Sequence, residues 1–423
     1  MVGFPMKKQR QWFKIFNVTS GNFFEMFDFM VFGMFAHMIA KSFFPSSSPY
    51  LSLMLSFVTF GTGFLMRPIG ALVLGGFIDK YGRKRGLLVT LGLMAFGTFT
   101  IAFTPDYSQI GIVAPLLILL GRLIQGFSAG AELGGVSVYL SEIAPAGRKG
   151  FYVSWQSASQ QLAVVCGALF GFVLSKILSI EQMAGFGWRI PFIFGCLVIP
   201  VVFFLRSYLQ ETESFKRAKH HPSINEIIRS TLANFPLIAG CSMMVMLTTV
   251  SFYMITAYTP TYAKDVIHLS GAKAFFITMC IGLANFIFLP LMGTLSDKVG
   301  RKKPLILFSG LFVLTAYPML NWLVHNSTFN HMLVVELWFS LLYAGYNGAM
   351  VVALTEIVPA NIRSISFSFA YSIATAIYGG FTPAIATNLI HFTDNPASPA
   401  LWLTIAGACS LITVLILGNK KLL

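Results

Sequence analysis

The stretch Gly75-Gly76-Phe77-Ile78-Asp79-Lys80-Tyr81-Gly82-Arg83-Lys84-Arg85 has a near copy at Gly293-Thr294-Leu295-Ser296-Asp297-Lys298-Val299-Gly300-Arg301-Lys302-Lys303. Both copies contain Asp-Lys-x-Gly-Arg-Lys, and the interval from Asp79 to Asp297 (297 − 79) is 218 residues. A second phrase, Ser141-Glu142-Ile143-Ala144-Pro145-Ala146, recurs as Thr355-Glu356-Ile357-Val358-Pro359-Ala360 after 356 − 142, or 214, residues. Two phrases that repeat at nearly the same interval indicate two copies of one structural unit.

The composition indicates that this repeat lies in a membrane protein. Of the 423 residues, 56% are hydrophobic and 10% are charged, whereas soluble domains contain about 25% charged residues. The charges gather in short clusters between apolar stretches of about 20 residues, the length that crosses a bilayer. A two-fold repeat in so apolar a chain is typical of membrane transporters.

Twelve apolar stretches predict an all-α integral membrane fold of two pseudo-symmetric halves with six helices each. They cover approximately residues 17–40, 50–77, 86–105, 112–140, 152–175, 187–207, 232–262, 270–293, 304–324, 331–355, 364–391 and 399–418. We therefore expect an N-terminal six-helix bundle at 1–207, a polar cytoplasmic linker at 208–231, and a C-terminal six-helix bundle at 232–423.

The distribution of lysine and arginine predicts the orientation of the chain. With a cytoplasmic N-terminus, most of the 29 basic residues fall in cytoplasmic loops and termini, and the opposite side holds Lys41, Lys176, Arg189, Lys264 and Lys273. Both termini are therefore expected in the cytoplasm. The first span is not a cleaved signal peptide, because it contains Glu25 and Asp28 where such a peptide is apolar.

The same distribution excludes several classes of partner. The net charge of +14 comes from clusters between apolar spans, so we expect a lipid bilayer around the chain and no nucleic acid. The five cysteines lie in apolar stretches without paired spacing, and His220-His221 has no further ligand nearby in sequence. No metal and no cofactor are therefore expected, and the protein is expected to be a monomer.

The repeated loops resemble the signature that the major facilitator superfamily has between its second and third helices and again between its eighth and ninth. Gly121-Arg122-Leu123-Ile124-Gln125-Gly126 resembles the Gly-Arg-x-x-Gln-Gly motif of proton-coupled members. Narrower matches make the chain similar to the metabolite–proton symporter branch, and within it most similar to citrate– and tricarballylate–proton symporters; they lie at residues 19–29, 66–70, 130–135, 155–161 and 187–192.

This resemblance implies import of a small di- or tricarboxylate with protons, by alternating access, across a bacterial inner membrane. Two other functions are weighed against it. A carrier of zwitterions such as betaine or proline is disfavoured by the short tail after the last span, and a drug–proton antiporter by the glutamine-rich sequence at 155–161. An enzyme is not expected, because the chain contains no metal triad, nucleophile elbow or phosphate loop.

Ionisable residues inside spans are costly, so their default interpretation is functional. The deep ones are Glu25, Asp28, Arg67, Arg122 and Glu132, all in the first half. The second half is predicted to hold no deep charge, because Glu336 falls near an outer helix end. The second half is therefore expected to contribute hydrogen bonds rather than charges to the site.

Arg122 is the best candidate anion ligand, because a guanidinium stays charged and fits a carboxylate bidentately. Asp28 is the best candidate proton carrier. When ionised it is expected to pair with Arg122, and its protonation would release Arg122 for the substrate. A structural ion pair is the alternative for both residues. Arg67 is expected either to bind substrate or to brace Glu132.

The predicted site can be grouped by role. Glu25 is either a second proton site or a hydrogen-bond brace, and Glu132 lies toward the cytoplasmic end of its helix, where an inner gate is expected. The substrate-binding candidates are Asn22, Arg67, Arg122, Gln125, Gln156, Gln160, Tyr258, Tyr262 and Asn347, and the proton-coupling candidates are Asp28, Glu25 and Glu132.

Three further features follow from the sequence: ion-pair gates, close helix packing and a helix break. The repeated loops are expected to form cytoplasmic ion-pair gates of Asp79, Arg83, Glu142, Arg148, Asp297, Arg301, Glu356 and Arg363. Gly126, Gly130 and Gly134, spaced by four, predict close helix packing. Tyr378-Gly379-Gly380, followed by Thr382-Pro383, predicts a break in the eleventh span.

Overall fold

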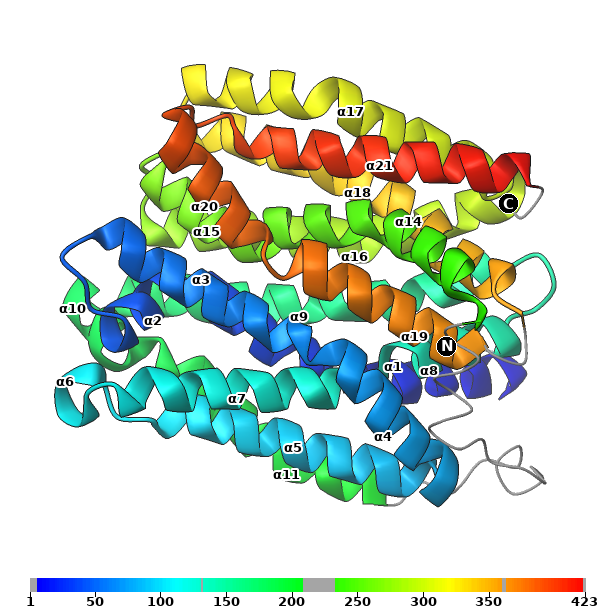
Figure 1. Cartoon of the computed structure of the whole chain (residues 1–423), viewed down its shortest axis with the longest axis horizontal. Helices are drawn as coiled ribbons and strands as arrows, with labels where there is room; N and C mark the ends of the chain where they lie inside the picture. Colours follow the sequence, from blue (N-terminus) through cyan, green and yellow to red (C-terminus); the bar gives the residue numbers. More distant parts are fainter. Residues whose placement is uncertain (1–5, 131, 208–232, 360–362, 421–423) are drawn as a thin grey trace.

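The computed structural model describes residues 6–130, 132–207, 233–359 and 363–420. Within these ranges every regular element is a helix, as the sequence predicts (Figure 1). The predicted linker at 208–231 lies outside them. The side chains of Asp79, Arg83 and Glu132 are also outside the described part, although their backbones lie in helices.

The first half is built from long helices that are often interrupted near their centres. The bent first span turns by 68° between its two pieces. The elements are α1 (Met6–Met34), α2 (Ala36–Phe43), α3 (Pro49–Leu65), α4 (Arg67–Tyr81), α5 (Arg83–Phe103), α6 (Tyr107–Ile110), α7 (Val113–Ala129), α8 (Glu132–Ile143), α9 (Lys149–Ile177), α10 (Ile180–Gln182), the π-helix η1 (Met183–Gly187) and α11 (Arg189–Ser207).

The second half repeats this pattern of long and interrupted helices. Its elements are α14 (Phe235–Tyr253), the π-helix η2 (Met254–Tyr258), α15 (Thr259–Asp265), α16 (Gly271–Val299), α17 (Lys302–His325), α18 (Phe329–Ile357), α19 (Arg363–Ala374), the π-helix η3 (Thr375–Gly379), α20 (Thr382–Thr393) and α21 (Pro399–Asn419).

Helices long and apolar enough to cross a membrane make up most of the described chain. Ten segments meet this description, and an eleventh if the bent pair Val18–Met34 and Ala36–Phe43 is one span. Leu88–Phe103 is a shorter apolar helix. A multi-pass membrane protein is thus confirmed, while the count of twelve spans stays a prediction.

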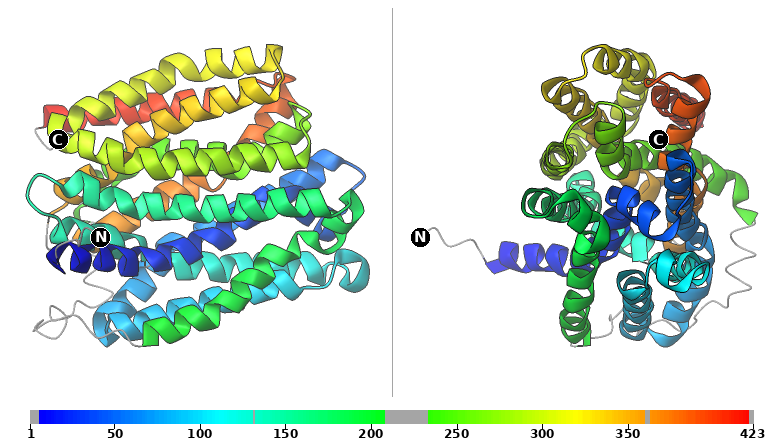
Figure 2. Two further views of the ribbon diagram at one scale, coloured as in Figure 1. Left: turned by 180° about the vertical axis from the view of Figure 1, so that it is seen from behind. Right: turned by 90° about the vertical axis from the view of Figure 1, so that its left-hand side faces the viewer.

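The two sets of helices lie side by side with their long axes roughly aligned (Figures 1 and 2). α9 of the first half runs along α16 of the second, and this is the most extensive contact between them. On the other side of the molecule α3 packs against α20, and α4 packs against α19. The interface between the halves therefore has two seams, with the middle of α1 and α14 enclosed between them.

Two π-helical bends interrupt spans of the second half. Pro260 follows η2, and a proline has no N–H and its ring clashes with the carbonyl four residues earlier, which favours such a bulge. Gly380 and Pro383 follow η3, so the predicted break in the eleventh span is confirmed. Both bends lie close to the middle of the molecule (Figure 1).

Glycines bring α7 against α3 and α4, as the spacing of four predicts. A Cβ on Gly126 would lie 1.6 Å from the carbonyl oxygen of Gly63, and a Cβ on Gly130 would lie 2.1 Å from that of Arg67. No side chain fits at these two positions, so the helix backbones touch. This contact fixes the positions of Arg67 at the start of α4 and of Arg122 in α7.

Arg189 ties the outer ends of α5 and α11 together. Its Nη1 donates to the carbonyl oxygens of Ala102 and Thr104, both at 2.8 Å, and its Nη2 contacts Asp106 Oδ1 at 2.6 Å. The guanidinium also lies 4.5 Å from the ring centre of Trp188, which is fully buried. The stretch at 187–192 is therefore a structural brace, remote from the centre.

Candidate functional site

Four ionisable side chains are buried in the middle of the first half. Glu25 and Asp28 come from α1, Arg67 begins α4, and Arg122 lies in α7; each is at most 4% exposed. Their burial agrees with their predicted depth in the spans. An ionised group in such a place requires partners, and the partners divide the four residues into two linked pairs.

Asp28 and Arg122 are connected through two neutral side chains. Thr98 of α5 donates a hydrogen bond to Asp28 Oδ2. Gln125 Nε2 donates to Thr98 Oγ1 at 3.0 Å, and Arg122 Nη1 donates to Gln125 Oε1 at 2.9 Å. The result is a continuous buried chain of hydrogen bonds from carboxyl to guanidinium.

The direct ion pair expected between Asp28 and Arg122 is not formed in this conformation. Protonation of Asp28 therefore cannot release Arg122 for the substrate by breaking a direct contact. Thr98 and Gln125 stand between the two groups, and the described side chains show no closer contact between them. Gln125, predicted as a substrate ligand, is instead a member of this relay. A change of charge on Asp28 must therefore reach Arg122 through reorientation of these side chains.

Arg122 lies among aromatic rings. Its guanidinium carbon is 4.3 Å from the ring centre of Phe29 and 4.6 Å from that of Phe32, distances typical of cation–π contacts. Its Nη2 donates to the carbonyl oxygen of Phe60 at 3.4 Å. Arg122 is thus enclosed by these rings and by the backbone of α3, and it does not line the central cavity described below.

Arg67 forms the second pair with Glu25. Arg67 Nη2 lies 3.3 Å from Glu25 Oε1, and the guanidinium carbon is 4.6 Å from the Phe29 ring centre and 4.7 Å from that of Phe64. The Phe29 ring therefore contacts both buried arginines. The predicted alternative, a brace between Arg67 and Glu132, falls on a side chain outside the described part.

A small cavity lies between the two halves, at the level of Arg67. Its lining comes from α1, α4 and α9 on one side and from α14, α19 and η3 on the other: Met26, Arg67, Gln160, Thr249, Phe252, Tyr253, Tyr371 and Thr375. One cation and several hydroxyl and amide groups thus surround a buried space. Such a lining suits a compact polar anion.

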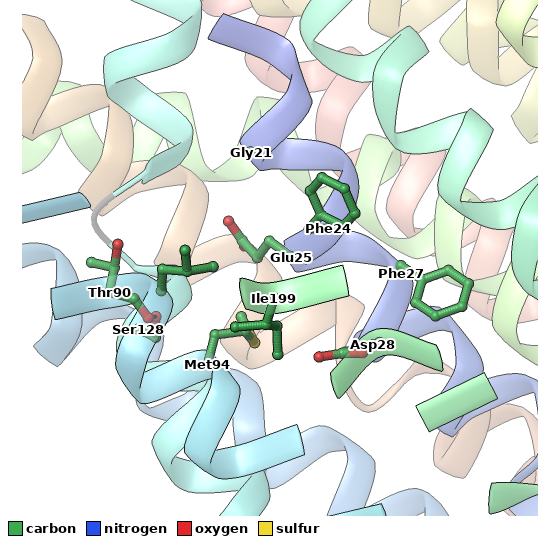
Figure 3. Close-up of a pocket in the computed structure, with 11 residues that line it drawn as sticks. Gly21, Phe24, Glu25, Phe27, Asp28, Thr90, Met94, Ser128 and Ile199 are labelled. Carbon is green, nitrogen blue, oxygen red and sulfur yellow. Dashed lines mark hydrogen bonds between the residues drawn. The ribbon is translucent and has the colours of Figure 1, made fainter. Parts of the chain in front are cut away.

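A second cavity lies inside the first half, on the other side of α1 (Figure 3). Glu25 and Asp28 both line it, together with Thr90 of α5 and Ser128 of α7. Glu25 therefore borders this second cavity, and its carboxylate contacts Arg67, which lines the central cavity. The two cavities are separated by the Glu25–Arg67 pair.

Only two of the nine predicted substrate ligands, Arg67 and Gln160, line the central cavity among the described residues. Asn22 instead braces α1 to α9, because its Nδ2 donates to the Gln156 carbonyl oxygen at 2.7 Å. Gln160 Nε2 donates to Asn22 Oδ1 at 3.2 Å and so ties this brace to the cavity. Asn347 lies beside Tyr343, to whose hydroxyl its Nδ2 donates at 3.4 Å.

Six lining residues lie outside the set of nine predicted ligands: Met26, Thr249, Phe252, Tyr253, Tyr371 and Thr375. Tyr253 packs against Phe60 and Phe64, with ring centres 5.8 Å and 5.1 Å away. The available signal was the run Thr248-Thr249 followed by Ser251 and Tyr253 in an otherwise apolar helix. Thr249 and Tyr253 are four residues apart and so lie on one face of α14.

Asp297 closes the α9–α16 seam at the end where α9 begins. Its Oδ1 accepts from the Gly150 amide at 2.8 Å and its Oδ2 from the Phe151 amide at 3.0 Å, at the first turn of α9. A carboxylate at a helix N-terminus is favoured by the free N–H groups and the helix dipole. Gly150 permits the contact, because a Cβ there would lie 2.3 Å from the Gly293 carbonyl oxygen.

Arg301 completes this inner cluster. Its Nη1 is 2.8 Å from Asp297 Oδ1, and its Nε is 3.1 Å from Glu356 Oε2 at the end of α18. Burial alone would lower the pKa of Arg301, but its hydrogen bonds to Glu356 and Asp297 outweigh burial and raise the pKa. Arg301 therefore stays protonated throughout the physiological pH range.

The other predicted gate residues are arranged differently. Arg363 donates to the Val358 carbonyl oxygen at 3.2 Å, so the expected Glu356–Arg363 latch is replaced by Glu356–Arg301. Glu142 and Arg148 are exposed, and no ion pair between them is seen in the described part. The side chains of Asp79 and Arg83, also predicted to form a gate, lie outside it.

The end of the molecule opposite the Asp297 cluster is closed by contacts of α15 and α20 with the first half, on the side predicted to be the outer one. His37 Nε2 is 2.6 Å from Asp265 Oδ2, and Tyr50 donates to Asn388 Oδ1 at 2.7 Å. Tyr258 and Tyr262, predicted as ligands, belong to this region; Tyr262 donates to the Pro396 carbonyl oxygen at 2.9 Å. The conformation thus has side-chain contacts on both sides of the central cavity.

The second half contains one buried carboxylate that the sequence-based prediction placed near the surface. Glu336 is 8% exposed, and Thr259 Oγ1 donates to its Oε1 at 2.9 Å. The sequence placed this residue close to a helix end, and its burial there was not predicted. Seven residues of helix precede Glu336 in α18, and the neighbouring α15 covers it, which sequence position alone did not show.

Comparisons with known proteins agree with this geometry. A family model described as "Major Facilitator Superfamily" matches residues 18–383. The chain is 52% identical to a citrate-proton symporter of Klebsiella pneumoniae over 407 residues, which are 96% of this chain and 92% of that protein. It is 30% identical to a glycine betaine/proline/ectoine/pipecolic acid transporter of Dickeya dadantii over 418 residues, covering 95% and 83% of the two chains.

A solved structure shows the same fold. The crystal structure of a D-xylose-proton symporter superposes with a TM-score of 0.77 and 18% sequence identity, covering 95% of this chain and 96% of that one. At this level of identity the likeness concerns the backbone alone. The arrangement of the helices is therefore shared more widely than the sequence.

Proposed function

The chain belongs to the Major Facilitator Superfamily, and from that premise we propose that it imports citrate or a closely related tricarboxylate together with protons. It is a proton-coupled transporter rather than an enzyme. The proposal of citrate rests on the similarity to citrate-proton symporters over nearly the whole chain and on the charges around the central cavity.

One observation supports an anionic substrate most directly: two buried guanidinium groups contact the same ring, Phe29. Arg67 borders the central cavity, and Arg122 adds positive potential from the layer behind it. A carboxylate entering the cavity can take a bidentate position on Arg67. Gln160, Tyr253 and Tyr371 line the cavity and offer hydrogen bonds to further substrate oxygens.

Glu25 provides the link to protons. Glu25 neutralises Arg67 at 3.3 Å, so an incoming carboxylate must compete with it. Protonation of Glu25 weakens that pair and frees Arg67 for substrate. Glu25 also borders the cavity inside the first half (Figure 3), from which a proton can reach it without crossing the substrate site.

Asp28 is proposed as the main proton carrier, which acts on Arg122 through Thr98 and Gln125 rather than by direct contact. It lines the same inner cavity, and Thr98 and Gln125 connect it to Arg122. Loss of negative charge on Asp28 leaves Arg122 less compensated and so raises the positive potential at the Phe29 ring. Protons thereby increase the affinity for an anion, which is what coupled import requires.

Transport proceeds in this proposal by rocking of two bundles, residues 1–207 and 232–423, joined by a cytoplasmic linker at 208–231. The bent pair and Leu88–Phe103, added to the ten longer segments, support twelve spans with both termini in the cytoplasm. The Asp297 cluster opens for release inside, and α15 and α20 open for loading outside. The monomer is placed in a bacterial inner membrane, in keeping with the bacterial relatives.

A zwitterionic substrate such as betaine or proline is the alternative. The Glu25–Arg67 pair offers one negative and one positive group at the cavity, which would suit a molecule with both charges, and a relative at 30% identity transports betaine and proline. The second arginine at Phe29 favours the anion, because it adds positive charge without a matching carboxylate in contact.

Uptake of labelled citrate into proteoliposomes with an inward proton gradient tests the proposal. Citrate should accumulate, an uncoupler should abolish accumulation, and unlabelled citrate and tricarballylate should compete more strongly than α-ketoglutarate or betaine. Empty liposomes provide the control. Competition by betaine alone would contradict the tricarboxylate assignment, and accumulation that survives the uncoupler would contradict proton coupling.

A further inference from the structure

Glu336 lies apart from the charged residues of the first half. It is in α18, seven residues after Phe329 at the start of the helix, and is 8% exposed. It faces the junction between η2 and α15, where Thr259 contacts it. The proposed transport mechanism does not use this carboxyl group.

The partners of Glu336 are too few for an ionised carboxylate. Oε1 contacts Thr259 Oγ1 at 2.9 Å, whereas Oε2 is buried and has no hydrogen-bond partner among the described residues. No lysine, arginine or histidine of the described part forms an ion pair with it. A buried, unpaired negative charge is strongly unfavourable in a bilayer, so this surrounding favours the neutral acid.

The hydroxyl of Thr259 supports the same conclusion by a count of hydrogens. Its Oγ1 lies 2.9 Å from Glu336 Oε1 and 3.3 Å from the Met254 carbonyl oxygen. A hydroxyl has one hydrogen to donate, so an ionised Glu336 and the carbonyl would have to share it. With a proton on Glu336, the carboxyl O–H donates to Thr259 and the threonine O–H donates to Met254, and both contacts are satisfied.

Other titratable groups near this site are few. Tyr262 of α15 is electrostatically coupled to Glu336, and Tyr258 of η2 and Tyr343 of α18 are further buried phenols. At the same end of the packed elements, the other described titratable groups are exposed or half-buried: Lys264, Asp265, His268, Lys273, His325 and His331, with His37 of α2 opposite Asp265. Asp297, Lys298, Lys302, Lys303 and Glu356 lie at the opposite ends of α16, α17 and α18. None of them balances a charge on Glu336.

α15 is the segment that Glu336 holds through Thr259. It begins at Thr259 and ends at Asp265, which contacts His37 of the first half at 2.6 Å. Just before it, the Tyr258 ring packs against Phe57 of α3, with 5.9 Å between ring centres. α15 therefore closes the outer side of the cavity, and the bend at η2 provides the flexible point behind it.

We propose that Glu336 is a second protonation site, located in the second half, whose proton holds α15 closed over the outer side of the cavity. When α15 swings outward, water reaches the carboxyl, its O–H bond breaks and the proton passes to that water. Proton uptake from the outer solution reverses the step and restores the contact with Thr259. Outer-side acidity thus promotes closure after loading.

Hydrogen exchange measured by mass spectrometry on the purified, substrate-free full chain tests this directly, independently of which substrate is carried. In the wild type, protection of residues 254–267 should fall by about tenfold as pH rises from about 5 to about 9, after correction for intrinsic exchange. In Glu336→Gln, a neutral mimic, protection should stay at its low-pH level. His37→Asn is the matched control and should keep the pH response.

The outcomes separate the proposal from a role of His37. If Glu336→Gln shows the wild-type pH response, or if His37→Asn alone abolishes it, the proposal is wrong. Thr259→Val is the second variant, for the case in which Glu336→Gln does not fold. It should lower protection of residues 254–267 at low pH and reduce the pH response; wild-type behaviour in Thr259→Val would equally contradict the proposal.

Discussion

The two halves of the molecule share a backbone pattern but differ in how they hold charge. In the first half, Glu25 compensates Arg67 at 3.3 Å, and Asp28 is joined to Arg122 through Thr98 and Gln125. In the second half, Glu336 is buried with Thr259 as its hydrogen-bond partner and no cation beside it in the described part. The repeated scaffold thus holds carboxyl groups in two ways. Glu25 and Asp28 are connected to arginines and can exchange them for other partners, whereas Glu336 is proposed to exchange a proton with water.

This difference indicates a division of labour. Paired charges respond to an incoming anion, because substrate can replace the carboxylate on an arginine. A solitary carboxyl responds instead to hydration, and so to the opening of the segment that covers it. The first half is accordingly suited to binding, and the second to sensing whether the outer side is open.

The comparison predicts the largest effect at Asp28. Asp28→Asn should reduce accumulation of citrate to the level of equilibration, because the relay to Arg122 can no longer change its charge. Exchange of labelled for unlabelled citrate at equal concentrations should persist, and both are measured in proteoliposomes.

Asp106→Asn serves as the control for Asp28→Asn, since Asp106 contacts Arg189 at the periphery of the same half. It should accumulate citrate normally once folded. Accumulation against the gradient by Asp28→Asn would show that the first half does not couple protons through this residue.

An intermediate effect is expected from breaking the Glu25–Arg67 pair. Arg67→Met leaves a buried carboxylate without its cation and should cost about 3–5 kcal/mol of stability. The double variant Glu25→Gln with Arg67→Met should recover much of this, measured as thermal unfolding of the purified protein, while citrate binding remains lost in both.

A double variant no more stable than Arg67→Met would contradict the view that these two charges compensate each other. Citrate binding by Arg67→Met with unchanged affinity would place the anion site elsewhere in the molecule. Isothermal titration on the folded double variant distinguishes loss of the site from loss of the fold.

The smallest effect is expected in the second half. Tyr371→Phe removes one hydroxyl at the central cavity and should weaken citrate binding by about 3- to 10-fold, in line with about 0.5–1.5 kcal/mol for a neutral hydrogen bond. Tyr346→Phe is the control, because that hydroxyl bonds the Met244 carbonyl oxygen away from the cavity. A loss as large as that of Arg67→Met would remove the proposed asymmetry between the halves.

The sequence predicted the helical membrane fold, the burial of Asp28, Arg67 and Arg122, and the close packing at Gly126 and Gly130. These features follow from local rules: length and apolarity of spans, the cost of charge in lipid, and small residues at a spacing of four. The break near Gly380 was likewise predictable, because two successive glycines with a proline three residues later favour the end of one helix and the start of another.

The lining of the cavity was less predictable, because it depends on rotation and tilt of helices relative to one another. Asn22 and Gln125 have the expected polarity, yet the first bonds the backbone of α9 and the second bridges Thr98 and Arg122. Tyr258 and Tyr262 lie on α15 or beside it, and the bend at η2 directs them to the outer contacts. Spacing along one helix does not contain this information.

The inner contact of Asp297 has a mechanical consequence. α9 runs unbroken from Lys149 to Ile177, so the two amides held by Asp297 and the cavity residue Gln160 belong to one rigid rod. Gly150 and Gln160 are ten residues apart, or about 15 Å along the axis at 1.5 Å per residue. A substrate that tilts α9 at Gln160 therefore also moves the two amide groups that are hydrogen-bonded to Asp297. Because Asp297 binds peptide N–H groups, substitutions of α9 side chains near Gln160 can change the cavity end while this contact is kept, as long as Gly150 remains glycine.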